Sequence, residues 1–401
     1  MRSFIKDFNM EKITFCIPSK NNLRYLKTCI PSIRKNAYNQ DHDIIVFVDS
    51  DHDGTIDWLT ENKDKYNLKF EINPDLNNSL FGIGKAYDKC IELAETDVIM
   101  IFHADMMLGK NADLNAFNLL ESKTVVCATR IEPPLHPNGG EKILQDFGIW
   151  PEDFKEELFD TFVNGQLGDD KVTEGIFAPW MIYKKEFLAI GGHDPILKSA
   201  REDSDVFNRL SLDGFTFKQP WNSLVYHLTG RGGQFQHGDV QGPKDEEWQK
   251  LMNNSTKEFI RKWGSGVKHT PLMLPIISPK YNIGIVLKNG NETLVRALEP
   301  WADVLYVDEG NVPTLIKSYI DSEQPNTAFD LFDRLKPYDN EKNSEILVEL
   351  DGSNFNQQDY KIITQLSDII KDSGSVGRFK LSNVVIEIIQ MNEYQNQLIK
   401  L

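Results

Sequence analysis

The 401-residue sequence has few cysteines, no long apolar run and no excess of basic residues. Its four cysteines lie far apart, and none forms a Cys-x-x-Cys pair or stands at zinc-ligand spacing from a histidine. This pattern argues against a disulfide framework or a zinc module and favours buried free thiols in a reducing compartment. We therefore expect a cytoplasmic protein. The four residues are Cys16, Cys29, Cys90 and Cys127.

Membrane and export signals are also lacking. The longest apolar candidates, Val98 to Phe102 and Pro271 to Ile277, fall far short of the roughly 18 residues that a membrane span requires. The segment from Met1 to Met10 is polar and has no apolar core of the kind found in secretion signals. We expect no membrane span.

The charge balance is acidic, with 44 Lys and Arg against 60 Asp and Glu and a formal net charge of -16. Such a chain repels a phosphate backbone, because nucleic-acid binding normally requires a clustered basic surface. Hydrophobic residues make up 40% and charged residues 26%, which is typical of a folded globular protein. The length predicts two or three domains. Nucleic acid is not an expected partner.

Short apolar runs alternate with amphipathic stretches over residues 12–130, as in a parallel sheet wound with crossover helices. Apolar residues spaced by three and four predict helices over 23–33 and 81–94. The carboxyl ends of parallel strands meet at one edge of the sheet, where such folds bind ligands. The expected strands are Ile13–Ile17, Ile44–Val48, Leu68–Ile72, Val98–Phe102 and Val125–Thr129.

The rest of the chain divides at three prolines within 271–279, the best candidate for a domain boundary. Residues 132–171 are rich in proline, glycine and acids, and we expect an irregular insertion or lid there. Further helices are expected over 184–190, 202–212 and 246–263, and strands over 215–217 and 223–226. The expected domains are an extension (1–11), a catalytic domain (12–270, with a nucleotide-binding half of about 12–130 and an acceptor half of about 131–270) and a small α/β domain (280–401) without recognisable chemistry.

Acidic and imidazole side chains follow two of the expected strands. Asp49 closes the second strand, and His103-Ala104-Asp105 follows the fourth. A carboxylate at the end of a buried strand can hold a hard divalent cation that bridges a diphosphate, so Asp105 is the best candidate for a metal ligand. Asp49 is also compatible with a turn built from Asp and Gly, and His103-Ala104-Asp105 with a turn that ends a strand.

Two further features lie later in the chain. Glu202 and Asp203 begin an expected helix, and His227 ends the last expected strand. Carboxylates in a first helical turn are stabilised by the helix dipole, or one of them deprotonates an acceptor hydroxyl as a general base. His227 is either structural or a second metal ligand beside Asp105.

Other features leave a functional and a structural interpretation open. The glycine-rich stretch 230–242 is either a loop that closes over donor phosphates or a plain connection. Trp180 either forms a wall of the acceptor site or packs in the core.

Taken in order, these motifs resemble the inverting glycosyltransferases of the family 2 type, which have the GT-A fold. The resemblance covers about residues 13–227. The fold class that we expect is α/β: a GT-A, Rossmann-like mixed sheet flanked by helices, with a second small α/β domain at the C-terminal side. The motifs are Ile17-Pro18-Ser19-Lys20-Asn21, Asp49 with its acidic turn, Gly82 to Asp88, His103-Ala104-Asp105, Gly191-Gly192-His193-Asp194, Glu202-Asp203-Ser204-Asp205 with Arg209 and Gly214, and His227.

The resemblance implies roles for individual residues. It makes Asp203 the general base with Glu202 beside it, and it implies Mn²⁺ or Mg²⁺ as the cofactor. The family usually has a carboxylate where this chain has His103, at the first position of its Asp-x-Asp metal motif. The implied metal ligands are Asp105, His227 and His103; the implied donor-binding residues are Pro18, Asn21, Asp49, Lys85, Ala104 and Arg231; Trp180 is the candidate for acceptor binding.

The expected function is metal-dependent transfer of a sugar from a nucleoside-diphosphate sugar to a hydroxyl of a glycan or glycoconjugate, with inversion, as in polysaccharide biosynthesis. A nucleotidyltransferase is one alternative, but that class opens with a glycine-rich basic loop, and Pro18-Ser19-Lys20-Asn21-Asn22 has no glycine. A non-catalytic nucleotide-sugar or glycan-binding protein is the other, and His103 favours it. The joint presence of Asp105, Asp203 and His227 favours the enzyme.

Overall fold

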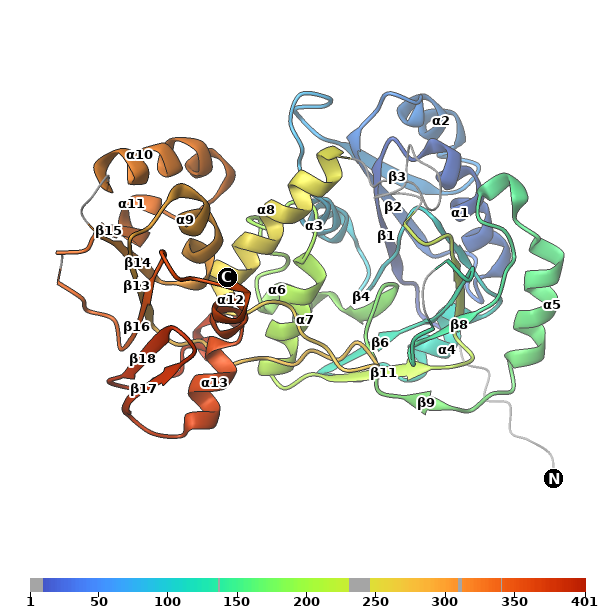
Figure 1. Cartoon of the computed structure of the whole chain (residues 1–401). Helices are drawn as coiled ribbons and strands as arrows, with labels where there is room; N and C mark the ends of the chain where they lie inside the picture. The colour runs from blue at the N-terminus through green and yellow to red at the C-terminus, as the bar shows by residue number, and fades with distance from the viewer. Residues whose placement is uncertain (1–9, 136–137, 231–245, 309–311, 340) are drawn as a thin grey trace. The chain divides into compact units, whose positions relative to one another are not determined.

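The computed structural model describes residues 10–135, 138–230, 246–308, 312–339 and 341–401 (Figure 1). The described residues separate into two compact units. The first unit holds the residues up to Lys250, His269–Pro275 and Leu401, and the second holds Leu251–Lys268 and Ile276–Lys400. Both units combine strands with helices, so the predicted α/β fold class is confirmed.

A mixed sheet of eight strands forms the centre of the first unit, in the order β3-β2-β1-β4-β10-β6-β11-β9. β1 pairs in parallel with β2 and with β4, whereas β10 runs antiparallel to β4 and β6. This is the Rossmann-like mixed sheet that the sequence predicted. The strands are β1 (Thr14–Lys20), β2 (Asp43–Ser50), β3 (Leu68–Ile72), β4 (Val98–Ile101), β6 (Thr124–Cys127), β9 (Val172–Thr173), β10 (Trp180–Tyr183) and β11 (Thr216–Pro220).

Helices α1 (Leu23–Asn36) and α3 (Ile83–Leu93) lie on opposite faces of β1 and β2 in Figure 1. Right-handed crossovers require this arrangement, because the chain moves outward from β1 to β3 and then returns past β1 to β4. The apolar side of α1 is buried, as its spacing predicted, and the helix continues through Pro31. The short helix α2 (Thr55–Asn62), which we did not predict, follows β2.

A second, four-stranded sheet has the order β5-β12-β7-β8. Only one residue, Ala128, separates β6 from β7, and the four residues Phe102-His103-Ala104-Asp105 separate β4 from β5. These two crossings carry the chain from the large sheet into the small one and place site residues between them. The strands are β5 (Met106–Leu108), β7 (Thr129–Glu132), β8 (Lys142–Leu144) and β12 (Leu224–His227).

The expectation of an irregular segment over 132–171 is wrong in part, because β8 and helix α5 (Glu156–Gln166) lie inside it. Only Phe159 and Val163 of α5 are buried, so the apolar pattern of this helix is weak in the sequence. The other helices of this part of the chain are α4 (Ala112–Phe117), η1 (Pro151–Asp153), α6 (Lys184–Ala189), α7 (Glu202–Leu212) and α8 (Glu246–Trp263).

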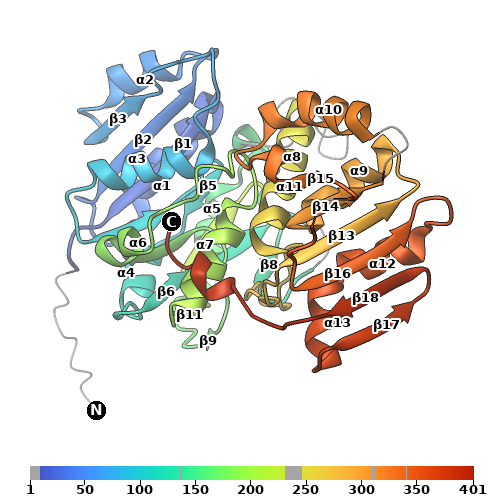
Figure 2. The same cartoon turned by 90° about the vertical axis from the view of Figure 1, so that its left-hand side faces the viewer.

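The second unit has a six-stranded sheet in the order β15-β14-β13-β16-β18-β17, and Figure 2 shows most of these strands side by side. Its strands are β13 (Ile283–Lys288), β14 (Val304–Val307), β15 (Leu335–Pro337), β16 (Ile346–Asp351), β17 (Gly377–Leu381) and β18 (Val384–Ile388). Its helices are α9 (Glu292–Leu298), η2 (Glu299–Trp301), α10 (Val312–Glu323), η3 (Gln324–Asn326), α11 (Leu331–Arg334), α12 (Gln357–Thr364), α13 (Leu366–Ser373) and η4 (Gln395–Leu398).

Most of α8 groups with this second unit, from Leu251 onward, whereas our predicted limit of 270 puts the whole helix in the first domain. The contacts explain the difference. Arg261 is fully buried and forms ion pairs with Glu299 and Glu323 of the second unit. The domain limits 12–270 and 280–401 remain our prediction.

The structure also bears on the expectations about the cysteines and about membrane spans. All four cysteines are buried and free, as predicted. Within the ranges that the structure describes, no helix has both the length and the hydropathy needed to cross a bilayer.

Candidate active site

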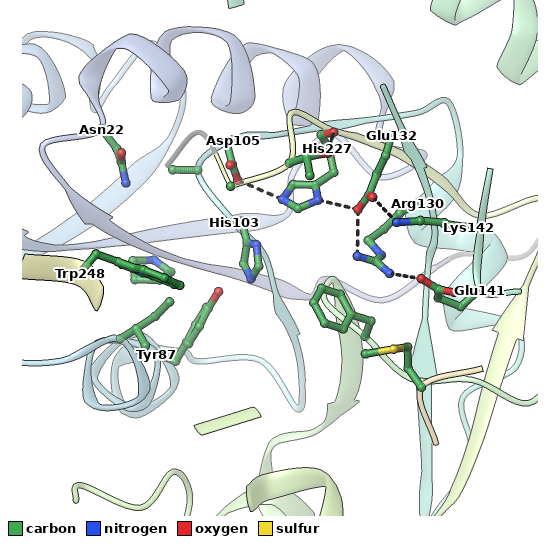
Figure 3. Close-up of a pocket in the computed structure, with 17 residues that line it drawn as sticks. Asn22, Tyr87, His103, Asp105, Arg130, Glu132, Glu141, Lys142, His227 and Trp248 are labelled. Carbon is green, nitrogen blue, oxygen red and sulfur yellow. Dashed lines mark hydrogen bonds and ion pairs between the residues drawn. The ribbon is translucent and has the colours of Figure 1, made fainter. Parts of the chain in front are cut away.

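A cavity of about 480 Å³ opens in the first unit beyond the carboxyl ends of β1 and β4. Because these strands are parallel neighbours, the residues that follow them reach the same edge of the sheet. Figure 3 shows the lining side chains, which also come from α3, the small sheet and α8. The lining residues are Pro18, Asn22, Ile83, Tyr87, His103, Ala104, Asp105, Arg130, Glu132, Glu141, Lys142, Phe177, His227, Thr229, Gly230, Trp248 and Met273.

Three potential metal ligands meet at this cavity. One ligand atom each from His103, Asp105 and His227 lies within 4.8 Å of the others. The Nε2 atom of His227 is 3.6 Å from Oδ1 of Asp105, and the rings of the two histidines are 5.7 Å apart. The antiparallel pairing of β12 with β5 sets His227 opposite Met106, directly after Asp105 in the sequence. A register between strands distant in sequence thus assembles the cluster.

A carboxylate on the far side holds the His227 ring. Nδ1 of His227 lies 2.9 Å from Oε1 of Glu132, the last residue of β7. Oε1 also accepts a hydrogen bond from Arg130, and Oε2 pairs with Lys142 at 3.0 Å. Burial by itself raises the pKa of Glu132, but the hydrogen bond with His227 and the nearby positive charges outweigh it. The pKa of Glu132 therefore lies well below its ordinary value.

The cluster has the chemistry of a site for a divalent ion. Burial lowers the pKa of His103 to about 4, against the opposing effect of Asp105, so this imidazole is neutral at pH 7 and has a lone pair to offer. A hydrogen bond from Nδ1 of His227 to Glu132 leaves the lone pair of His227 on Nε2, on the side of Asp105. Two imidazole nitrogens and one carboxylate oxygen therefore converge, and these residues fit a bound metal.

The acidic start of α7 is a second titratable cluster. Burial, and next the adjacent Asp203, raise the pKa of Glu202 to about 8. The Oε2 atom of Glu202 is shielded from solvent and has no hydrogen-bond partner among the described residues. Asp203 accepts a hydrogen bond from the backbone N–H of Ser204 at 2.6 Å. Glu202 packs against α3, where its Cβ atom approaches Gly84, about one helical turn before the lining residue Tyr87.

Asp205, at the same helix start, has a structural role. Its carboxylate accepts a hydrogen bond from Nε of Arg209 at 2.8 Å, and both side chains are fully buried. Arg209 also donates to the backbone carbonyls of Ile190 and Gly192. The pair thus fixes the glycine motif against α7. In that motif, His193 pairs with Asp88 of α3 through Nδ1 at 2.7 Å.

Pro18 and Ala104 line the cavity, whereas the predicted donor-binding residues Asn21, Asp49 and Lys85 are not among its lining residues. The buried carboxylate of Asp49 accepts hydrogen bonds from the backbone N–H groups of Phe81, at 2.8 Å, and Gly82, at 3.1 Å. The side chain of Asn21 accepts one from the backbone of His52. Lys85 is exposed on α3, with Nζ 5.7 Å from the ring centre of Phe81. Arg231 and most of the 230–242 stretch lie outside the described residues.

Trp180 does not line the cavity. It sits in β10 between β4 and β6, is 1% exposed, and packs edge-on against Phe207 and at a tilt against Phe187. A strand in the middle of a sheet covered on both faces has no route for its side chain to solvent. Of the two interpretations that the sequence left open, the structure favours the core.

Several lining residues were missed in the sequence. Glu132 is an acid at the end of a strand, the same signal that drew attention to Asp49, but we assigned it to the irregular segment. Arg130 and Lys142 flank it on β7 and β8. Tyr87 and Trp248 lie on helices. An aromatic residue in the apolar pattern of a helix is explained by packing, so the sequence offered no reason to assign these two to a binding site.

Comparison with known proteins gives one family match and several distant structural likenesses. Residues 14–188, a little under half of the chain, match the family model described as glycosyl transferase family 2. Asp203 and His227 lie beyond the matched residues. No curated protein matches the chain.

The structural likenesses are weak. A crystal structure of GalNAc-T7 with UDP, GalNAc and Mn2+ has 13% identity and a TM-score of 0.46, covering 64% of this chain and 49% of that one. A crystal structure of TarS from S. aureus has 14% identity and a TM-score of 0.41, covering 62% of this chain and 40% of that one. The alignments thus span half or less of these proteins. Over residues 14–188, this chain is similar to the glycosyl transferases of family 2.

Proposed function

We propose that the protein transfers a sugar from a nucleoside-diphosphate sugar to an acceptor hydroxyl of a glycan or glycoconjugate, with inversion and with the help of a divalent metal. The observation that carries the proposal is the cluster of His103, Asp105 and His227 in the cavity at the ligand-binding edge of the family 2 domain. Such an edge is where open α/β sheets bind nucleotides.

His103, Asp105 and His227 would hold the ion. Two imidazole nitrogens in the set favour a first-row transition ion such as Mn²⁺ over Mg²⁺, which prefers an all-oxygen shell. When bound, the ion supplies positive charge that neutralises the departing nucleoside diphosphate. In this proposal Pro18 and Ala104, which line the cavity, contact the donor.

Asp49 has a less direct part in donor binding. Its carboxylate orders the backbone at Phe81 and Gly82, immediately before α3, so we assign it to shaping the donor site. The proposed contacts of Asn21, Lys85 and Arg231 with the donor stay predictions, as does any contact of Trp180 with the acceptor.

Asp203 is the proposed general base. It accepts the proton of the acceptor hydroxyl while that oxygen attacks the anomeric carbon from the side opposite the diphosphate. The new glycosidic bond forms as the bond to the diphosphate oxygen breaks, and the anomeric configuration inverts. The packing of Glu202 against α3, the helix that carries the lining residue Tyr87, supports this assignment, because it brings the start of α7 close to the cavity.

The test is release of nucleoside diphosphate from a panel of nucleotide-sugars, with and without Mn²⁺, by the wild type and by Asp105→Asn and Asp203→Asn. Asp97→Asn is the matched control, because Asp97 lies exposed just before β4 whereas Asp105 follows the same strand. We expect the wild type to release nucleoside diphosphate only when Mn²⁺ is present. Both site variants should reduce this release by roughly 100-fold or more, and the control should release it at the wild-type rate.

The two site variants should differ in donor binding, which the thermal shift of each protein measures. Asp203→Asn should keep donor binding, since the base acts only on the acceptor, while Asp105→Asn should lose it. If no donor is cleaved and none raises the melting temperature, the proposal is wrong. Proton NMR of the product would give the anomeric configuration, and retention would exclude the single displacement.

A further inference from the structure

Glu132 lies behind His227 and does not belong to the three potential ligands. The imidazole of His227 is held between two carboxylates: Nε2 faces Asp105 at 3.6 Å, and Nδ1 lies 2.9 Å from Glu132 (Figure 3). The side chain of His227 is 9% exposed and that of Glu132 is 3% exposed, so water does not compete for this contact. The contact therefore restricts the rotation of the ring.

Glu132 is itself held in place by two cations. Nη1 of Arg130 lies 2.9 Å from Oε1, and Nζ of Lys142 lies 3.0 Å from Oε2. Arg130 is fixed in turn by Glu141 at 3.1 Å and by the ring of Phe177, whose centre is 3.9 Å from the guanidinium carbon. The two cations balance the charges of Glu132 and Glu141, so the carboxylate that faces His227 has a fixed position.

The hydrogen bond has a chemical consequence for His227. A neutral imidazole carries one N–H and one lone pair, and a carboxylate beside Nδ1 selects the form with the proton on Nδ1. The lone pair is then on Nε2, directed to the side of Asp105. Without Glu132, the ring is free to turn and to take the other tautomer, which presents an N–H where a lone pair is required.

We propose that Glu132 is a positioning residue that fixes the orientation and tautomer of His227 for metal binding. This inference rests on the proposed function, because it requires the metal site. A purely structural role is the competing explanation: Glu132 would then only neutralise Arg130 and Lys142, and its loss would act on metal binding independently of His227.

A double-mutant cycle separates the two explanations, with binding of Mn²⁺ alone to the full chain as the readout, followed by electron paramagnetic resonance of the free ion. We expect Glu132→Ala to weaken Mn²⁺ binding by roughly 10-fold to 100-fold. In a chain that already carries His227→Ala, adding Glu132→Ala should cause no further loss, because the residue acts through the ring. An equal loss in both backgrounds would overturn the proposal, since independent effects add.

Two variants control for damage to the fold. Asp97→Asn removes an exposed carboxylate just before β4, away from the cavity, so Mn²⁺ affinity should stay at the wild-type level. Glu132→Gln keeps the side-chain volume and an oxygen that accepts from Nδ1, so it should bind Mn²⁺ more tightly than Glu132→Ala. Equal weakening by the two Glu132 variants would overturn the hydrogen-bond account, and circular dichroism checks that each variant is folded.

The same titrations distinguish a failure of this inference from a failure of the proposed function. If the wild type does not bind Mn²⁺, or if Asp105→Asn binds it equally well, the metal site itself is wrong and the inference falls with it. If Asp105→Asn loses Mn²⁺ and Glu132→Ala does not, only the role of Glu132 is wrong.

Discussion

The raised pKa of Glu202 predicts how the stability of the folded chain depends on pH, and this dependence can be tested without a substrate. Burial and the neighbouring Asp203 raise the pKa of this carboxyl group from 4.5 to about 8 in the folded chain. The unfolded chain exposes the same carboxyl to water, where its pKa is ordinary. Between these two values the folded state holds a proton that the unfolded state has released.

The sign and size of the effect follow from proton linkage. A raised pKa in the folded state means that the contribution to stability is complete below the unfolded pKa and is lost as the pH rises toward the folded pKa. With pKa values of 4.5 and about 8 for Glu202, the free energy of unfolding falls by about 2–3 kcal/mol between pH 5.5 and pH 7.5 through this group alone. The variant Glu202→Gln cannot release the proton and escapes this loss.

The assay is urea unfolding of the wild type and Glu202→Gln at pH 5.5, 6.5 and 7.5. All other groups titrate in both proteins, so their effects cancel in the difference between the two free energies of unfolding. As the pH rises, the variant should gain stability relative to the wild type by about 1.4 kcal/mol per pH unit at most. Asp203→Asn removes the negative charge that, after burial, raises the pKa of Glu202. In this background the loss of stability through Glu202 should therefore begin at a lower pH. A difference that is constant with pH would show that Glu202 is ionised throughout in the folded chain, and the reasoning would fail.

Two further predictions concern residues away from the cavity. Trp180→Ala should lower the free energy of unfolding by about 3–5 kcal/mol, because Trp180 is a core residue. Leu188→Ala, at a side chain that is 46% exposed on α6, is the control and should change it little. Similar effects of the two substitutions would contradict the core position of Trp180. Glu299→Ala should destabilise the second unit by about 3–5 kcal/mol, because it leaves Arg261 and Arg334 buried without their shared carboxylate. Glu292→Ala, which breaks an exposed pair on α9, is its control in thermal unfolding, and equal melting temperatures for the two variants would contradict the prediction.

Much of the large sheet was predictable, because β2, β4 and β6 are short runs of mostly apolar, buried residues. Helix α7 matches the predicted 202–212 at both ends, and α8 matches 246–263. By contrast, α2 and α5 escaped notice because few of their residues are buried: Thr55 and Leu59 in one, Phe159 and Val163 in the other. Helices that bury so few residues leave a weak apolar pattern for spacing to reveal.

The candidate site was predictable to the extent that it lies at strand ends. Asp105 and His227 both stand at the edge of a strand, and the structure brings them together with His103. Asp49 gives the same signal, yet its carboxylate is used by backbone N–H groups. An acid at a strand end therefore indicates the right edge of the sheet but does not tell a ligand from a structural carboxylate. That distinction depends on which neighbours donate hydrogen bonds to the carboxylate oxygens, and those neighbours are distant in sequence.

The position of His227 shows why sequence alone could not supply the geometry. Successive side chains of a strand point to opposite faces, so the direction of His227 depends on where Tyr226 points. Tyr226 is fully buried, stacks on Phe154, and its hydroxyl accepts a hydrogen bond from the backbone N–H of Phe147 at 3.0 Å. A slip of β12 by one residue would expel this tyrosine from its aromatic surroundings. The packing of an apolar neighbour thus fixes the register that directs His227 into the cavity toward Asp105.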